Sequence, residues 1–153
     1  MIEKTSSGER GKMVHTMNHV GLSVENLEKS VEFYTEVLGM EVDYHAHHEG
    51  KPISDVVGLE HAVLEICMVK KGEARLELIE YKDREPKPGR YKPQNEPGLI
   101  HISFAVSSVD EEYRKIKALG YEAYSDPMVT RKNGPKICYV KGPDSVIFEL
   151  YEK

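Results

Sequence analysis

Apolar and polar residues alternate along two stretches of the chain, residues 18–24 and residues 99–106. Alternation with a period of two is typical of a β-strand that buries one face. After each stretch, apolar residues recur at every third or fourth position, which predicts two amphipathic helices over residues 27–38 and 109–119. Residues suited to begin and end these helices stand at the expected places: Asn26 and Ser108 as N-caps, Gly39 and Gly120 as C-caps.

Each predicted helix is followed by three further predicted strands. They cover residues 40–44, 61–70 and 74–81 in the first half, and residues 121–124, 135–140 and 146–151 in the second half. Glycine-containing turns separate several of them, at residues 71–72, 133–134 and 142–145. Residues 51–60 contain Pro52 and Gly58 and are expected to form a loop.

The two halves of the chain repeat the same order of strand, helix and three strands. His19 precedes the cap Asn26 at the same spacing as His101 precedes Ser108. We therefore interpret the chain as an internal duplication of a βαβββ module. The predicted fold class is α+β, with two tandem βαβββ modules that form a curved mixed sheet around a cleft.

The predicted domain organisation follows from this duplication. Residues 14–153 form a single domain, in which residues 14–81 are the first module, residues 82–98 a linker and residues 99–153 the second module. The linker contains four prolines, which exclude a helix and a central strand, so we expect it to be semi-extended. Residues 1–13 are polar and are expected to be a flexible N-terminal tail.

The composition narrows the class of protein. A length of 153 residues with 39% hydrophobic residues is sufficient for one domain with its own core. The net charge of −5 argues against nucleic acid as a partner. No apolar run is long enough to span a membrane, and the polar start lacks the apolar segment of a signal peptide, so we expect a cytoplasmic protein. Cys67 and Cys138 are expected to be reduced thiols.

Each module carries one histidine in its first strand and one glutamate in its last strand: His19 with Glu77, and His101 with Glu149. Strand alternation places each of them opposite its apolar neighbours, so the four side chains could share one concave face. Two imidazoles and two carboxylates suit a divalent metal ion, and an octahedral ion would keep two positions for water or substrate. Any one of these side chains alone is more commonly a solvated surface residue, but matched positions in two repeats favour a metal site.

Two other groups of side chains could contribute to a site. A second set of histidines could line a substrate pocket or hold a second metal ion, or could simply be an exposed strand end: His45, His47, His48 and His61. Several tyrosines could line an aromatic pocket, although packing on an amphipathic face is the more common role: Tyr34, Tyr44, Tyr81, Tyr91 and Tyr139.

The paired modules and three motifs resemble the vicinal oxygen chelate superfamily. The motifs are H-V-G-L-S-V-E-N-L-E-K-S-V-E-F-Y-T-E-V-L-G-M at residues 19–40, H-I-S-F-A-V at residues 101–106 and G-P-D-S-V-I-F-E-L at residues 142–150. This superfamily includes glyoxalase I, methylmalonyl-CoA epimerase, thiol transferases that act on fosfomycin, extradiol dioxygenases and bleomycin-binding proteins. The resemblance covers residues 15–153.

The resemblance implies a metal-dependent enzyme of lyase or isomerase type, closest in its ligand set to glyoxalase I-like proteins such as lactoylglutathione lyase. The family's metal positions fall on His19, Glu77, His101 and Glu149, around one Ni, Co, Zn, Mn or Fe ion in a metal-centred cleft. The implied reaction is chelation of an oxygen-bearing small substrate, after which Glu149 or Glu77 moves a proton through a metal-stabilised enediolate. A homodimer is also expected, with the site either within one chain or shared between two.

Several departures keep other functions open. Ser23 and Tyr81 stand where glyoxalase I carries an arginine and an asparagine for glutathione, which argues against glutathione as a co-substrate. The basic linker could bind another anionic substrate or could be a solvated loop. An epimerase would carry glutamine near position 77, and an extradiol dioxygenase would need only His19, His101 and Glu149. A small-molecule binding or resistance protein without turnover is a further alternative.

Overall fold

The structure, a computed structural model, describes residues 16–85, 87 and 89–153. The predicted flexible tail, residues 1–13, lies outside the described residues. Within the described part of the chain, no helix is long and apolar enough to cross a membrane.

Both modules contain the predicted order of strand, helix and three strands, with the helix Lys51–Val57 added in the first module and the two-residue strand Met128–Val129 added in the second. The first module consists of β1 (Val20–Ser23), α1 (Leu27–Glu32), the π-helix η1 (Phe33–Val37), β2 (Glu41–Glu49), α2 (Lys51–Val57), β3 (Val63–Lys71) and β4 (Ala74–Tyr81). The second consists of β5 (His101–Val106), α3 (Val109–Ala118), β6 (Glu122–Ala123), β7 (Met128–Val129), β8 (Lys136–Lys141), the short 3-10 helix η2 (Pro143–Ser145) and β9 (Ile147–Glu152). The α+β class and the two βαβββ modules are therefore confirmed.

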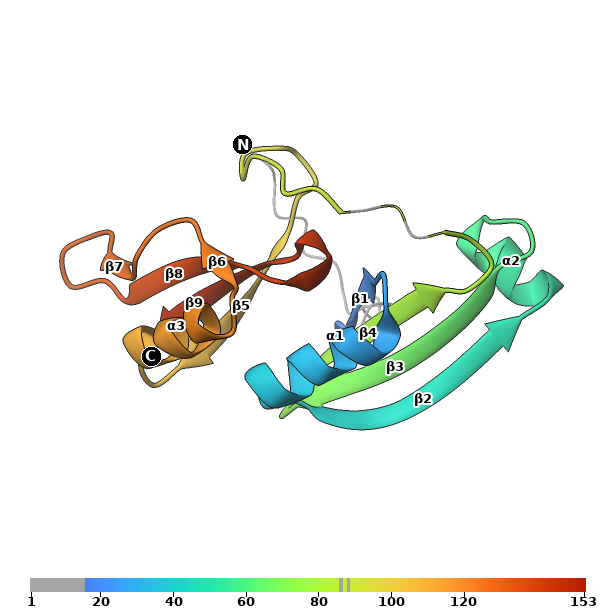
Figure 1. The fold of residues 1–153 in the computed structure, drawn as a ribbon, viewed down its shortest axis with the longest axis horizontal. Coiled ribbons are helices and arrows are strands. Elements are labelled where there is room, and N and C mark those ends of the chain that lie inside the picture. Colours follow the sequence, from blue (N-terminus) through green and yellow to red (C-terminus); the bar gives the residue numbers. More distant parts are fainter. Residues whose placement is uncertain (1–15, 86, 88) are drawn as a thin grey trace, which may run out of the picture.

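Each module forms its own mixed sheet, and the two sheets lie side by side (Figure 1). The strand order is β1-β4-β3-β2 in the first sheet and β5-β9-β8-β6 in the second, with β7 paired to β8. In both sheets the first strand of the module runs parallel to the last strand, and the next pairing is antiparallel. Strands β1 and β5 therefore each lie at the edge of a sheet.

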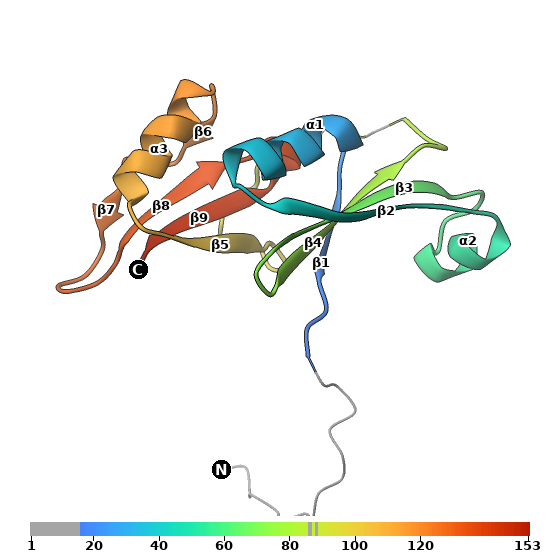
Figure 2. The ribbon, with the colours of Figure 1, turned by 90° about the horizontal axis from the view of Figure 1, so that it is seen from below.

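A shared hydrophobic core joins the two modules. Phe33 and Tyr34 of η1 contact Phe148 of β9, with ring centroids 5.6 Å and 5.9 Å apart, and all three side chains are buried. Helices α1 and α3 lie on the same side of the strands in Figure 2. Because large aromatic side chains contribute strongly to packing, this contact holds the two sheets in a defined relative position.

The predicted N-caps begin both long helices. Asn26 Oδ1 accepts a hydrogen bond from the backbone N–H of Lys29 at 2.9 Å. Ser108 Oγ accepts one from the backbone N–H of Glu111 at 3.3 Å. In each case the side chain satisfies a backbone donor in the first helical turn that would otherwise lack a partner.

The prediction of a loop over residues 51–60 is wrong, because Lys51–Val57 forms helix α2. Pro52 lies in the first helical turn, where its missing N–H removes no intrahelical hydrogen bond. Gly58 follows the helix with a φ of +68°, a left-handed conformation that glycine adopts readily. The proline and glycine that suggested a loop therefore mark the two ends of a short helix.

The strand boundaries differ from the prediction in the outer parts of both sheets. Strand β2 continues to Glu49, beyond the predicted end at residue 44. Of the predicted strand 121–124, only Glu122–Ala123 pairs with a neighbour, and the sequence pattern does not predict β7. Two-residue strands are too short to show a recognisable alternation.

Candidate functional site

His19 and Glu77 face each other on the first sheet. Gly21 of β1 lies opposite Glu77 of β4 in the parallel pair, and His19 lies two residues before Gly21. Residues two apart along an extended chain point to the same face, so His19 lies on the face that carries Glu77. His19 Nε2 is 3.3 Å from Glu77 Oε2. We call this pair the N-terminal half-site.

His101 and Glu149 repeat this arrangement on the second sheet. Ser103 of β5 lies opposite Glu149 of β9, and His101 lies two residues before Ser103. His101 Nε2 is 3.7 Å from Glu149 Oε2. We call this pair the C-terminal half-site. The same strand register therefore produces one histidine–glutamate pair in each module.

Both half-sites lie on sheet faces that point away from the shared core. The apolar neighbours of the two glutamates are buried in that core: Leu76, Leu78, Phe148 and Leu150. The side chains of Glu77 and Glu149 are 21% and 16% exposed, and those of His19 and His101 are 34% and 41% exposed. Solvent can therefore reach the polar atoms of both pairs.

The N-terminal half-site has a second polar contact behind the imidazole. His19 Nδ1 lies 2.7 Å from the side-chain oxygen of Asn18. When Nδ1–H donates to this oxygen, the proton stays on Nδ1 and the lone pair of Nε2 is available. The residue opposite Glu77 on β3 is the buried Met68. Sequence reasoning did not identify Asn18, although its position directly before the histidine was a usable signal.

The C-terminal half-site has a tyrosine next to it. Tyr139 of β8 lies opposite Glu149, and its hydroxyl is 3.4 Å from His101 Nε2. The two rings have centroids 4.9 Å apart. Burial raises the pKa of Tyr139 and the nearby Glu149 carboxylate raises it further, so the hydroxyl keeps its proton at neutral pH. The sequence placed Tyr139 in a broad aromatic group, and only the strand register assigns it to this pair.

The structure brings the four candidate ligands together as two pairs and not as one set. Within residues 16–85, 87 and 89–153, no group of three or more His, Cys, Asp or Glu side chains is placed to hold a metal ion. Each half-site offers one imidazole nitrogen and one carboxylate oxygen, donors that suit Zn, Ni, Co, Fe or Mn. Two donors leave most of the coordination sphere unfilled. The donor chemistry therefore fits a divalent ion, and a complete site requires the two half-sites to be adjacent.

The second group of histidines is divided between different surfaces. His45 and His47 share a face of β2, while His48 lies on the opposite face and His61 lies in a turn. His47 Nδ1 is 2.7 Å from Glu65 Oε1, and the hydrogen bond to this carboxylate raises the pKa of His47. Both ring nitrogens of His47 face carboxylates, since Nε2 lies 3.6 Å from Glu49 Oε2. These contacts describe an exposed ion-pair network.

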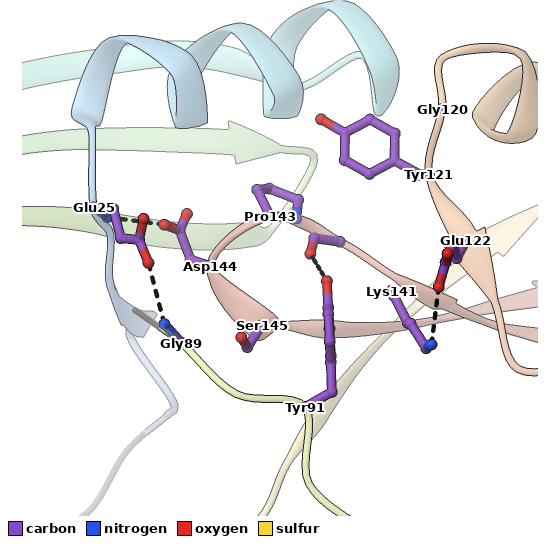
Figure 3. A pocket seen from close by; sticks show the side chains of 11 residues that line it. Glu25, Gly89, Tyr91, Gly120, Tyr121, Glu122, Lys141, Pro143, Asp144 and Ser145 are labelled. Carbon is purple, nitrogen blue, oxygen red and sulfur yellow. Dashed lines mark hydrogen bonds and ion pairs between the residues drawn. The ribbon is translucent and has the colours of Figure 1, made fainter. Parts of the chain in front are cut away.

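A pocket of about 450 Å³ lies where the two modules meet the linker (Figure 3). Asp144 accepts hydrogen bonds from the backbone N–H of Glu25 at 2.8 Å and from Ser30 Oγ at 2.9 Å. The backbone N–H of Gly89 in the linker donates to Glu25 Oε1 at 3.1 Å. None of the four candidate ligands lines this pocket. Its polar contacts join the modules and the linker.

Two of the basic side chains near the start of the linker have acidic partners. Lys82 pairs with Glu80 at 2.7 Å, and Arg84 pairs with Asp83. Both basic residues line a second pocket, of about 540 Å³, beside the first sheet. Their charges are partly offset by these neighbours, and binding of an anionic substrate by the linker stays a prediction.

The fold defines a class of α+β protein in which two βαβββ modules each present one histidine–glutamate pair. The family model of the Glyoxalase/Bleomycin resistance protein/Dioxygenase superfamily matches residues 16–150, and the chain belongs to this superfamily. A glyoxalase family protein from Bacillus cereus has a similar structure, with a TM-score of 0.83 and 26% identity over 95% of this chain and 98% of that chain.

Two further similar proteins have more specific descriptions. Human mitochondrial methylmalonyl-CoA epimerase is 24% identical over 88% of this chain and 72% of its own length. A variant of the fosfomycin resistance protein FosX from Listeria monocytogenes has a TM-score of 0.62 and 21% identity, over 91% of this chain and 90% of that chain. The FosX structure contains Mn(II) and 1S,2S-dihydroxypropylphosphonic acid. At that identity the likeness shows the fold alone.

Proposed function

We propose that the protein is a divalent-metal-dependent enzyme of lyase or isomerase type that moves a proton at a carbon next to a carbonyl group. The observation that carries this proposal is the matched pair of half-sites, with Nε2–Oε2 distances of 3.3 Å and 3.7 Å. The similarity to methylmalonyl-CoA epimerase supports it, because epimerisation next to a carbonyl removes and returns one proton. A glyoxalase-type reaction requires the same removal, with return of the proton to the neighbouring carbon.

The four residues of the half-sites would hold the metal ion: His19, Glu77, His101 and Glu149. When bound, the ion supplies Lewis-acid stabilisation of the negative charge that develops on a substrate oxygen as the proton leaves. Glu149 and Glu77 provide carboxylate oxygens that can accept this proton and return it. Asn18 keeps His19 in the tautomer whose Nε2 is free to bind.

We further propose that a complete site forms between two copies of the chain. Strand β1 directly follows His19, strand β5 begins with His101, and both are edge strands. Edge strands expose backbone N–H and C=O groups and are common places for pairing between chains. In a two-fold dimer, the N-terminal half-site of one copy can meet the C-terminal half-site of the other, and symmetry then produces a second identical site.

Metal analysis followed by a substrate panel tests the proposed reaction. The purified protein is dialysed against each candidate ion and then assayed with methylmalonyl-CoA, hemithioacetals and catechols. We expect retention of a divalent ion and turnover of a substrate whose reaction moves a proton next to a carbonyl. Oxygen-dependent cleavage of a catechol would contradict the proposal in favour of a dioxygenase. A chain that retains no metal ion would contradict it in favour of a binding protein.

A mixing experiment tests whether two copies share the site. His19→Ala and His101→Ala chains each lack one ligand, and each alone should bind the metal ion weakly. In a mixed dimer with shared sites, one site carries both substitutions and the other carries neither. In an equal mixture with random exchange, about half of the dimers are mixed and each mixed dimer has one intact site of two, so we expect mixing to restore about a quarter of the tight metal binding of the wild type. A site contained within one chain would show no recovery, and His47→Ala serves as a control outside both half-sites.

A further inference from the structure

The two half-sites differ in the residue that lies opposite the glutamate on the neighbouring antiparallel strand. In the C-terminal half-site this residue is Tyr139, opposite Glu149. In the N-terminal half-site it is Met68, opposite Glu77. Met68 is 1% exposed, and its thioether has no proton to donate. At the position opposite the glutamate, a hydroxyl group is therefore present only in the C-terminal half-site.

The hydroxyl of Tyr139 lies beside the atom of His101 that would bind a metal ion. His101 Nε2 is 3.4 Å from this hydroxyl and 3.7 Å from Glu149 Oε2. A nitrogen lone pair that binds a metal ion cannot also accept a hydrogen bond. With an ion on Nε2, the phenol must therefore donate to another acceptor. A substrate oxygen bound to the same ion would lie close to the hydroxyl of Tyr139.

We propose that Tyr139 is a substrate-contacting residue, which donates a hydrogen bond to a substrate oxygen at the C-terminal half-site. This inference rests on the proposed function, because it requires a metal ion beside His101.

A purely structural role for Tyr139 would depend on its ring and not on its hydroxyl. The rings of Tyr139 and His101 are 4.9 Å apart with an interplanar angle of 39°, so the tyrosine also packs against the imidazole. Tyr139→Phe keeps this packing and removes only the donor. The variant therefore separates recognition of a substrate oxygen from positioning of His101.

The experiment uses the full chain loaded with Co²⁺, whose visible absorption reports both metal binding and a change of ligands. Acetohydroxamate is the probe, because it presents two neighbouring oxygens, one of which carries negative charge. We expect the Co²⁺ affinity of Tyr139→Phe to be no lower than that of the wild type, because removal of the hydroxyl frees the Nε2 lone pair of His101. The affinity of the loaded protein for acetohydroxamate should fall on the order of tenfold, as for loss of a hydrogen bond to a charged oxygen. Tyr151→Phe, on the same strand face as Glu149, is the matched control and should leave both affinities unchanged.

Three results would overturn the inference in different ways. An unchanged acetohydroxamate affinity in Tyr139→Phe removes the substrate contact and leaves the proposed function intact. A lowered Co²⁺ affinity or a changed spectrum with unchanged acetohydroxamate affinity makes Tyr139 a positioning residue for His101. Absence of Co²⁺ binding by the wild type overturns the proposed function itself, and the inference with it.

If Tyr139→Phe fails to fold, a second measurement on the wild-type protein tests the same contact. In wild-type protein with ¹³C-labelled tyrosine, nuclear Overhauser contacts to the His101 ring identify the resonances of Tyr139. Addition of acetohydroxamate to protein loaded with diamagnetic Zn²⁺ should shift the ring carbon that bears the hydroxyl of Tyr139. The chemical shift of the same carbon of Tyr151 should stay unchanged. An unchanged Tyr139 chemical shift at a saturating concentration of acetohydroxamate would overturn the inference.

Discussion

The two half-sites share their main-chain geometry and differ in the side chains that support it. In both modules the histidine lies two residues before the position opposite the glutamate. Asn18 contacts the N-terminal histidine from behind, whereas the equivalent position before His101 is the exposed Ile100. Tyr139 contacts His101 on the side of Nε2, where the other module has Met68. Strand register therefore sets the ligand pairs, while neighbouring residues make the two pairs chemically unequal.

Substitution of Glu77 or Glu149 by glutamine should have the largest effect on turnover. Comparison of the two variants tests whether both carboxylates accept the proton. Glutamine cannot accept a proton, so Glu149→Gln and Glu77→Gln should each lower turnover by roughly a hundredfold to ten-thousandfold. Steady-state kinetics on the substrate found in the panel measures this loss, with circular dichroism to verify folding. Unequal losses would show that one half-site holds the main base. Wild-type turnover in either variant would remove that glutamate from the mechanism.

Loss of the aromatic contact between modules should have the next largest effect. Phe148→Ala removes a buried ring that packs on both Phe33 and Tyr34, and should lower the free energy of unfolding by about 3–5 kcal/mol. Denaturant unfolding measures this change. Hydrogen exchange should show that strands of both modules lose protection together. Loss confined to the second module would contradict a shared core, and the exposed Val129→Ala is the control.

The residue directly before each histidine should produce a smaller difference between the half-sites, in their metal affinity. Asn18→Ala removes the acceptor of His19 Nδ1–H and should weaken metal binding on the order of tenfold. Ile100→Ala, at the equivalent position of the other module, should leave metal affinity unchanged. Competition titration with Co²⁺ measures both variants. Equal effects would show that the two histidines are held in the same way.

The smallest expected effect is on the pH dependence of stability, and it comes from His47, which lies in neither half-site. Its pKa is raised by the Glu65 carboxylate, so folding favours the protonated form. The stabilising contribution is present below the pKa of the unfolded state and is lost as pH rises through the higher pKa of the folded state. Glu65→Gln should lower the pKa of His47 in an NMR titration and reduce stability more at pH 5 than at pH 8. An unchanged pKa would contradict the ion pair.

Features that repeat in both halves could be predicted from the sequence. The caps Asn26 and Ser108 lie where they were expected, because capping depends on one side chain and the helical turn that follows it. The pairing of each histidine with its glutamate also follows from register, which alternation of apolar residues specifies. Such local patterns depend on neighbouring residues and not on the tertiary packing of the rest of the chain.

Some features that occur only once could not be predicted. Helix α2 has no counterpart in the second module, and Pro52 and Gly58 are compatible with both a loop and a short helix. The separation of the two half-sites depends on how Phe33 and Phe148 pack the sheets together. That contact joins residues far apart in the sequence, and no local pattern encodes its geometry.

The contacts of Asp144 have a consequence for the order in which the protein folds. Its side chain bonds to Glu25 and Ser30, which precede it by 119 and 114 residues. Contacts between such distant residues form late, because closing a long loop costs conformational entropy before the contact stabilises anything. During synthesis, the strands of the first sheet are complete before Phe148 is made. The emerging first module therefore presents an uncovered aromatic surface, Phe33 and Tyr34, until the last strand of the protein is synthesised.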